Sequence, residues 1–257
     1  MLKTGIYVDG ENIRLCGGYG MRYDVLKKYV AMDDSVILRA NSYVVEDLEQ
    51  TEKDDEYRRK LYRYHDVLRS HGFKLIKKPV QRYVNSDGEV TVKANVDMDL
   101  GIDALLQSAH LDRVVLLSGD GDFCHLLQAM QNFGCRVEVI GFLNVAKRLK
   151  ETADFYLSGF MIPGLLPTGE NGSIIRGYPV NYWQDKGYGF FRHLEMDEDG
   201  LHEKEVFFHH SHFEDEIATE ALTRSSNIFE FRLVPSTVKD GDLMATEIRH
   251  TQSHVVI

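Results

Sequence analysis

The sequence predicts an α/β domain with a parallel sheet at residues 1–162 and a small all-β barrel at residues 174–257. Before residue 163, apolar strand-like runs alternate with segments of helical spacing, an alternation typical of a parallel sheet covered on both faces. After residue 173, short β-rich runs follow one another closely, as in an antiparallel barrel. The stretch between, 163–173, holds two of the five prolines and three glycines without periodicity, so we expect a linker there.

The elements of the first domain follow from period and stop signals. The apolar runs predict strands at 5–12, 36–45, 73–84, 113–123 and 135–142. Apolar residues at helical spacing predict helices at 53–72, 98–106 and 122–134. Two of these helices end at a glycine, Gly72 and Gly134, which is a common helix stop.

Five β-rich runs make up the expected barrel. They occupy residues 173–183, 186–194, 204–213, 227–235 and 243–251. Asp199-Gly200 and Asp240-Gly241 lie between runs and are typical turn pairs.

Composition and charge limit the classes of function. The chain has 257 residues, 43% hydrophobic residues and a net charge of −10, which argues against a broadly basic nucleic-acid binder. Residues 1–162 carry 22 Lys and Arg against 24 Asp and Glu, whereas residues 163–257 carry 8 against 16. Nucleic-acid contacts in the second part would therefore depend on stacking and on local basic residues.

The small number of cysteines and the lack of a recognisable targeting signal favour a cytoplasmic protein. Cys16, Cys124 and Cys135 are too few for a disulfide framework and show no CxxC spacing. No apolar stretch approaches the roughly 20 residues of a membrane span, and no apolar signal region precedes the first strand. We therefore expect a cytoplasmic location and no membrane partner.

Acidic residues follow three of the apolar segments. Asp9 ends the first strand, Asp97 lies in the segment 95–106, and Asp120 and Asp122 end the strand 113–123. The carboxyl ends of parallel strands share one edge, where open α/β folds bind ligands. Carboxylates that meet there need a hard cation between them, and oxygen ligands suit Mg²⁺ or Mn²⁺. The pattern predicts a metal site that acts on phosphate esters.

Each acid also has a structural interpretation. Asp97 can be a helix N-cap, and Asp120 and Asp122 can be a turn and a second cap. Asp99 and Asp103, four residues apart, would share one helix face.

The three acidic segments, YVDGEN, VDMDLGIDAL and LLSGDGDF, resemble the motifs of NYN domains, a branch of the PIN-like nucleases. This resemblance implies a PIN-like α/β fold with an acid cluster that binds Mg²⁺ or Mn²⁺ and cleaves RNA. It implies metal-site roles for Asp9, Asp97, Asp120 and Asp122, with Asn12 and Asp103 as further catalytic residues. Ser118 and Asp99 would support them. PIN-like domains often pair, so a homodimer is also an expectation.

Basic residues of the first domain are candidates for phosphate contacts. Lys77 and Lys78 lie at the end of the expected strand 73–84, and we weigh RNA binding and solvent exposure equally for them. A second cluster, Arg58 to Arg63, lies on the helix 53–72 beside several acids, which favours a solvated face.

The segments KGYGFF and VFFHHS resemble the paired RNA-contact motifs of cold-shock domains, which are OB-fold barrels. Strand alternation would place aromatic side chains of both segments on one outer face, where bases can stack. The expected contact residues are Lys186, Tyr188, Phe190, Phe207 and His209. Phe191 and Phe208 would then lie in the barrel core, and Trp183 could belong to either side.

Together these patterns predict a metal-dependent ribonuclease whose OB domain binds single-stranded RNA. Two other functions stay open: an RNA-binding regulator without turnover, and a phosphatase or nucleotidase for small phosphate esters. DNA stays open beside RNA, because no residue can be named that reads a 2′-hydroxyl.

Overall fold

A computed structural model of the protein describes residues 1–32, 34–84, 90–93, 96–167, 174–197, 199–236 and 241–251. The chain forms two compact units. The first contains residues 1–19 and 23–158, and the second contains residues 20–22 and 159–257.

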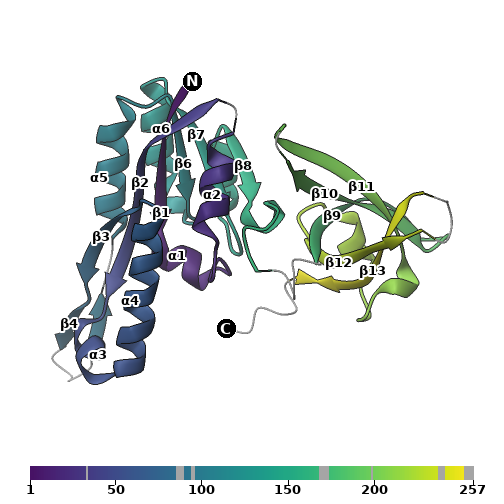
Figure 1. Cartoon of the computed structure of the whole chain (residues 1–257), viewed down its shortest axis with the longest axis horizontal. Helices are drawn as coiled ribbons and strands as arrows, with labels where there is room; N and C mark the ends of the chain where they lie inside the picture. Colours follow the sequence, from purple (N-terminus) through teal and green to yellow (C-terminus); the bar gives the residue numbers. More distant parts are fainter. Residues whose placement is uncertain are drawn as a thin grey trace. The chain divides into compact units, whose positions relative to one another are not determined.

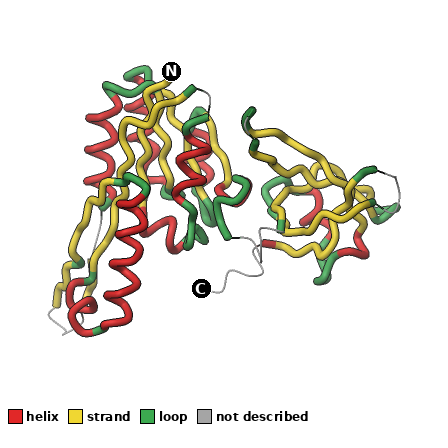
Figure 2. Tube along the Cα trace, viewed as in Figure 1, coloured by secondary structure: helices red, strands yellow, loops and turns green. Residues whose placement is uncertain are grey.

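The first unit is built on a six-stranded sheet in the order β3-β2-β1-β6-β7-β8, in which all neighbouring strands run parallel (Figures 1 and 2). Its strands are β1 (Leu2–Asp9), β2 (Ser35–Glu46), β3 (Lys74–Pro79), β6 (Arg113–Leu117), β7 (Arg136–Gly141) and β8 (Phe155–Ser158). The strand order reverses direction between β1 and β6, which makes this pair the topological switch point. The predicted α/β class is confirmed.

Helices cover both faces of the sheet. They are α1 (Gly10–Leu15), α2 (Tyr23–Val30), α3 (Leu48–Lys53), α4 (Asp55–Ser70), α5 (Asp97–Ser108), α6 (Cys124–Asn132) and α7 (Lys147–Thr152), with the 3₁₀ turns η1 (Gly121–Phe123) and η2 (Gly159–Met161). α5 and α6 pack on the face that carries Tyr7 and Leu116, where Leu100 and Leu127 complete a buried apolar cluster.

The segment 73–84 differs from its prediction as one strand. β3 ends at Pro79, and β4 (Gln81–Val84) leaves the sheet to pair antiparallel with β5 (Val90–Lys93). Proline has no N–H group to donate to a neighbouring strand, so a strand commonly ends there.

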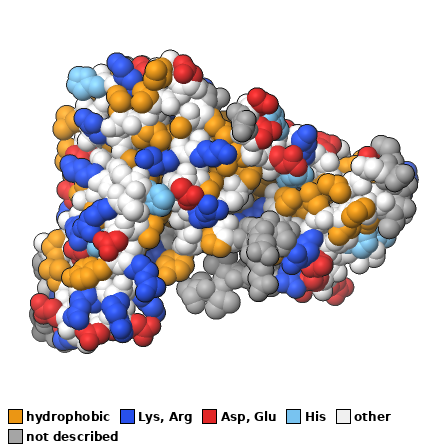
Figure 3. Space-filling model, viewed as in Figure 1, with side chains coloured by type: hydrophobic (Ala, Val, Ile, Leu, Met, Phe, Trp, Pro, Cys, Tyr) orange, Lys and Arg blue, Asp and Glu red, His pale blue; other side chains and the backbone are white. Residues whose placement is uncertain are grey.

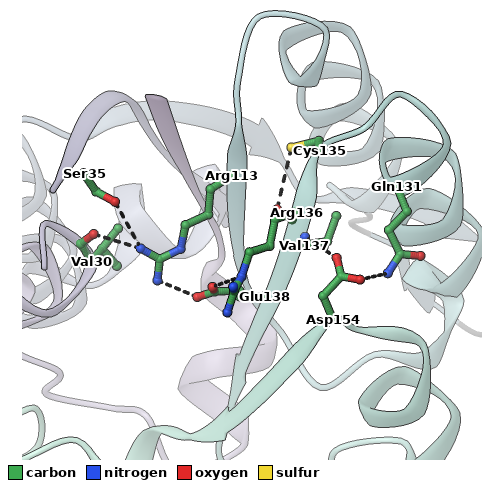
Figure 4. A network of polar contacts seen from close by, with 9 residues as sticks. All are labelled: Val30, Ser35, Arg113, Gln131, Cys135, Arg136, Val137, Glu138 and Asp154. Carbon is green, nitrogen blue, oxygen red and sulfur yellow. Dashed lines mark hydrogen bonds and ion pairs between the residues drawn. The ribbon is translucent and has the colours of Figure 1, made fainter. Parts of the chain in front are cut away.

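A buried ion pair joins β6 and β7 (Figure 4). The Arg113 and Glu138 side chains form it, and both residues are only 4% exposed. Arg113 also donates to the carbonyl of Val30 at 3.1 Å, which ties α2 to the sheet. Arg136 donates to the second Glu138 oxygen at 2.7 Å from a more exposed position.

The second unit contains a closed five-stranded barrel in the order β10-β11-β13-β12-β9. Its strands are β9 (Ile175–Trp183), β10 (Tyr188–Met196), β11 (Leu201–His209), β12 (Phe229–Pro235) and β13 (Leu243–His250). β11 and β13 pair in parallel, and the other pairs are antiparallel. A five-stranded closed barrel of this kind confirms the expected OB-like architecture.

The barrel core is aromatic. Phe191 and Phe208 are fully buried and stack with ring centroids 4.1 Å apart, which confirms their prediction as core residues. Gly189 makes room for this packing, because a Cβ atom there would lie 2.3 Å from the Asn181 carbonyl and 2.7 Å from the Phe208 ring.

The expected linker 163–173 begins with packed residues. Leu165 and Leu166 are buried, and Leu165 accepts a hydrogen bond from the Arg22 N–H at 2.7 Å. The rest of the linker, from residue 168, lies outside the described residues. Among the helices that the structure describes, none has the length and apolar character needed to cross a membrane.

Candidate active site and nucleic-acid interface

The candidate active site lies at the carboxyl ends of β1 and β6, the switch point of the sheet. β1 ends in Asp9, and β6 leads into Ser118 and Asp120. Ligands of doubly wound sheets bind in the crevice at this point. The sheet topology therefore brings two of the three predicted acidic segments to one place.

Asp9 is the most buried acid of the site, with 3% of its surface exposed. Its Oδ1 accepts from the Asn12 N–H at 3.1 Å, which caps α1, and its Oδ2 accepts from the Ser118 hydroxyl at 2.9 Å. The pKa of Asp9 is raised to about 6, chiefly by burial and to a smaller extent by the neighbouring charges of Asp97 and Asp120, while the two hydrogen bonds act to lower it. A cation beside Asp9 would reverse this repulsion.

Ser118 and Asn12 hold the loop after β6 against the end of β1. The Ser118 hydroxyl accepts from the Asp120 N–H at 3.1 Å while it donates to Asp9. The Asn12 side-chain oxygen accepts from the Gly119 N–H at 2.8 Å. These contacts fix where Asp9 and Asp120 lie relative to one another.

Asp97 is the first residue of α5 and is partly buried. Val96, not Asp97, occupies the N-cap position, and no side chain caps this helix. Asp97 therefore lies beside the N-cap position, in the first turn of the helix, and not at the N-cap itself. Asp120, by contrast, does cap η1, because its Oδ1 accepts from the Asp122 N–H at 2.9 Å.

The oxygen atoms of these acids suit a hard cation, although the side chains do not form a complete metal-binding site in the structure. Asp9, Asp97 and Asp120 offer carboxylate oxygens, the ligand type that Mg²⁺ and Mn²⁺ prefer. Within the described ranges, no three His, Cys, Asp or Glu residues are grouped closely enough to hold a metal. The raised pKa of Asp9 is the observation that favours a cation here.

Asp122 is exposed and paired with a basic residue. Its side chain is 85% exposed, and its Oδ1 lies 2.8 Å from Nη2 of Arg148 on α7. The structure therefore does not bring Asp122 to Asp9.

Asp99 and Asp103 belong to a row of polar contacts that attaches α5 to the sheet. Asp99 pairs with Lys78 of β3 at 2.7 Å. Asp103 accepts from the Tyr43 hydroxyl of β2 at 2.9 Å. One turn later, Gln107 accepts from the Tyr7 hydroxyl of β1 at 3.0 Å.

No sequence motif singles out Tyr43 and Tyr7 as residues of this site. Tyr43 lies directly opposite Asp9 in the β1–β2 register and is fully buried. The only signal for it is the alternation of β2, which places Tyr43 and Asn41 on the same face.

The basic residues of the first unit are mostly paired. Lys77 contacts Glu46 at 2.5 Å, and Lys78 contacts Asp99 as described above. On α4, Arg58 pairs with Asp55 and Lys60 pairs with Glu56. Figure 3 shows blue and red side chains mixed over this part of the surface, as a solvated helix face would have.

The barrel carries an aromatic cluster on its outer face. Tyr188 and Phe190 of β10 lie beside Phe207 of β11, with ring centroids 5.6 and 5.9 Å from it. Trp183 of β9 extends the cluster, at 5.2 Å from Tyr188, and is 39% exposed. We call these four residues the aromatic platform. Tyr182, the neighbour of Trp183, instead stacks on Phe208 of the core.

His209 and Lys186 lie beside the platform. His209 is opposite Tyr188 in the β10–β11 register, and its Nδ1 contacts the Ser211 hydroxyl at 2.8 Å. Lys186 is exposed in the turn before β10. The structure thus brings together the expected contact residues of the second unit.

Comparisons with known proteins cover the first unit. The NYN domain family matches residues 3–161. A crystal structure of a protein of unknown function from Vibrio parahaemolyticus is similar at 26% sequence identity, with a TM-score of 0.50 over 61% of this chain and 92% of that chain. No curated protein matches.

Proposed function

The chain belongs to the NYN domain family, a branch of the PIN-like nuclease superfamily, and from this we propose that it is a ribonuclease that hydrolyses phosphodiester bonds of single-stranded RNA with Mg²⁺ or Mn²⁺. The observation that carries the proposal is Asp9, a buried carboxylate at the switch point with two further carboxylates near enough to raise its pKa. Such perturbed acids in a cleft are typical of catalytic sites.

In the proposed site, Asp9, Asp97 and Asp120 would hold the metal, with their side chains closer together than they lie in the structure. When bound, Mg²⁺ or Mn²⁺ supplies charge to the phosphoryl oxygens and lowers the pKa of a coordinated water. Ser118 and Asn12 position the ligands, because both contact the loop that carries Asp120. Asp103 would not touch the metal. It would act indirectly, through its hydrogen bond with Tyr43, which lies opposite Asp9.

Asp122 stays in the proposal in a different role. The resemblance to NYN domains implies that Asp122 is a metal ligand, but in this structure its carboxylate is paired with Arg148. We assign it to the rim of the site and not to the metal.

The aromatic platform supports RNA as the substrate. Bases of any sequence can stack on exposed aromatic rings, at about 1–3 kcal/mol per base. Lys186 and His209 border the platform, where a phosphate backbone would pass. Because residues 163–257 are acidic overall, binding would depend on this platform more than on long-range attraction.

The test is a cleavage assay with an end-labelled single-stranded RNA in Mg²⁺, Mn²⁺ or EDTA, for the wild-type protein and for Asp9→Asn and Asp120→Asn. We expect metal-dependent cleavage by the wild type and a loss of cleavage in both variants. Asp99→Asn is the matched control, because it removes a carboxylate from α5 that pairs with Lys78 instead of facing Asp9. Undiminished cleavage by the Asp9 and Asp120 variants would contradict the proposal.

A second candidate function is an RNA-binding regulator without turnover, which the aromatic platform alone would support. RNA binding by the wild type without cleavage in either metal would select this function. Hydrolysis of a small chromogenic phosphate, with no action on RNA, would instead indicate a phosphatase.

A further inference from the structure

Arg148 lies against the loop that carries two of the acids. The Ala146 N–H, just before α7, donates to the Gly119 carbonyl at 2.9 Å. This contact brings the first turn of α7 to the loop after β6, where Arg148 meets Asp122 at 2.8 Å. The positively charged guanidinium of Arg148 therefore lies at the rim of the acidic site.

Gly121 gives the guanidinium its place. A Cβ atom at Gly121 would lie 2.5 Å from Nε and 3.0 Å from Nη2 of Arg148. The guanidinium therefore lies directly over the turn between Asp120 and Asp122, in space that any larger residue would fill.

The pair between Arg148 and Asp122 is exposed, with 65% and 85% of the two side chains accessible. Exposed ion pairs are weak and exchange readily. Arginine, in contrast, binds phosphate through two parallel hydrogen bonds. A phosphate that reaches the site can thus replace Asp122 as the partner of Arg148 at little cost.

The other cations of α7 have partners elsewhere. Lys147 is 88% exposed and lies 3.5 Å from Glu151. Lys150 lies 4.8 Å from the centre of the Tyr156 ring. Lys147 is therefore a matched control for Arg148, since it is on the same helix and carries the same charge.

We propose that Arg148 is a substrate-binding residue that exchanges Asp122 for a non-bridging oxygen of an RNA phosphate. The inference rests on the proposed function, because it assumes that a phosphodiester enters the site of Asp9. Arg148 would neutralise charge on the phosphate, while Asp122 holds it in place in the free protein.

The experiment compares Arg148→Ala, Arg148→Lys, Gly121→Ala and Lys147→Ala in the full chain, with a fluorescent oligouridylate as the probe. We expect Arg148→Ala to lower kcat/KM by about 10–100-fold, as loss of a charged hydrogen bond does. Arg148→Lys should recover part of the loss. Gly121→Ala should lower kcat/KM by less than Arg148→Ala and without changing the net charge, because the exposed guanidinium can move away from the added Cβ. Lys147→Ala should stay within about twofold of the wild type.

Salt dependence separates phosphate binding from a structural role. In EDTA, the slope of log Kd for the probe against log salt should become shallower by about 0.7 for Arg148→Ala, as loss of one single-strand phosphate contact predicts. Equal slopes for Arg148→Ala and Lys147→Ala would overturn the inference, as would equal kcat/KM values. If the wild type binds the probe but does not cleave it, the proposed function fails, and the slopes alone decide the role of Arg148.

Discussion

At the scale of single residues, Asp9 combines burial with two like charges. A carboxyl in this position is costly to ionise, and two hydrogen bonds offset only part of the cost. A bound cation would stabilise the ionised form of this carboxyl, which agrees with the proposed role of Asp9 as a metal ligand. It also gives the protein without metal a measurable pH dependence.

The folded-state pKa of Asp9 is about 6, raised from an ordinary value of 3.8. Between these values the folded protein keeps a proton that the unfolded chain has lost, so rising pH lowers the free energy of unfolding. The free energy of unfolding should fall by about 3 kcal/mol in total. This fall begins near pH 4 and is complete once the pH has risen above the folded-state pKa of about 6. We expect urea denaturation in EDTA to show this fall for the wild type and not for Asp9→Asn. Parallel pH profiles for the two proteins would contradict it.

Tyr43 links the sheet to α5 through its hydroxyl, which donates to Asp103 and accepts from Asn41 at 3.1 Å. Tyr43→Phe leaves buried polar groups without a partner, so we expect a loss of about 1–3 kcal/mol in the free energy of unfolding. We also expect slower RNA cleavage, because Asp103 loses its orientation. Tyr64→Phe is the matched control, since it removes a partly buried hydroxyl that contacts the Tyr23 hydroxyl. That variant should lose stability and keep its cleavage rate, so equal rates for both variants would contradict the role of Tyr43.

At the scale of elements, α5 contacts three strands in succession. Asp99, Asp103 and Gln107 reach β3, β2 and β1 at intervals of one helical turn. The spacing of Asp99 and Asp103 on one helix face follows from the sequence alone. Their partners do not, because these depend on which strands lie beneath the helix and in what register.

The same distinction applies to the site. That Asp9 and Asp120 end neighbouring strands could be predicted, because apolar runs that stop at an acid place it at the carboxyl edge. The pairing of Asp122 with Arg148 could not, because it depends on how α7 returns to the loop. The division of 73–84 into two strands also escaped the pattern, although Pro79 was its signal.

The ion pair of Arg113 and Glu138 gives a prediction for the sheet itself. Glu138→Gln keeps the shape of the side chain but leaves a buried guanidinium without its counter-charge, which costs about 3–5 kcal/mol. Arg136→Met removes the exposed partner of the same carboxylate and should cost no more than about 1 kcal/mol. Chemical denaturation of both variants measures the difference, and similar losses would contradict the assignment of the buried pair.

At the scale of the whole molecule, two units of different architecture are joined in one chain. In the proposed function, the first would carry out the phosphate chemistry and the second would bind unpaired bases. The residues that support these two proposals lie in different units. Their functions can therefore be separated by variants that affect one unit at a time.

Phe207→Ala should weaken binding of a fluorescent single-stranded RNA by about 5–150-fold in EDTA, the equivalent of one lost base stack. Phe133→Ala is the matched control, because Phe133 is a 65% exposed phenylalanine on the first unit. Fluorescence anisotropy gives both affinities. Equal affinities would remove the platform from the proposal.

The strand order of the barrel has a consequence for how the chain folds during synthesis. β13 is the last strand that the structure describes, and it lies between β11 and β12. Until Leu243 to His250 have left the ribosome, β11 and β12 each keep an unpaired edge, while the first unit is already complete. The nascent barrel is therefore open and prone to aggregation until β13 has been synthesised and pairs with β11 and β12.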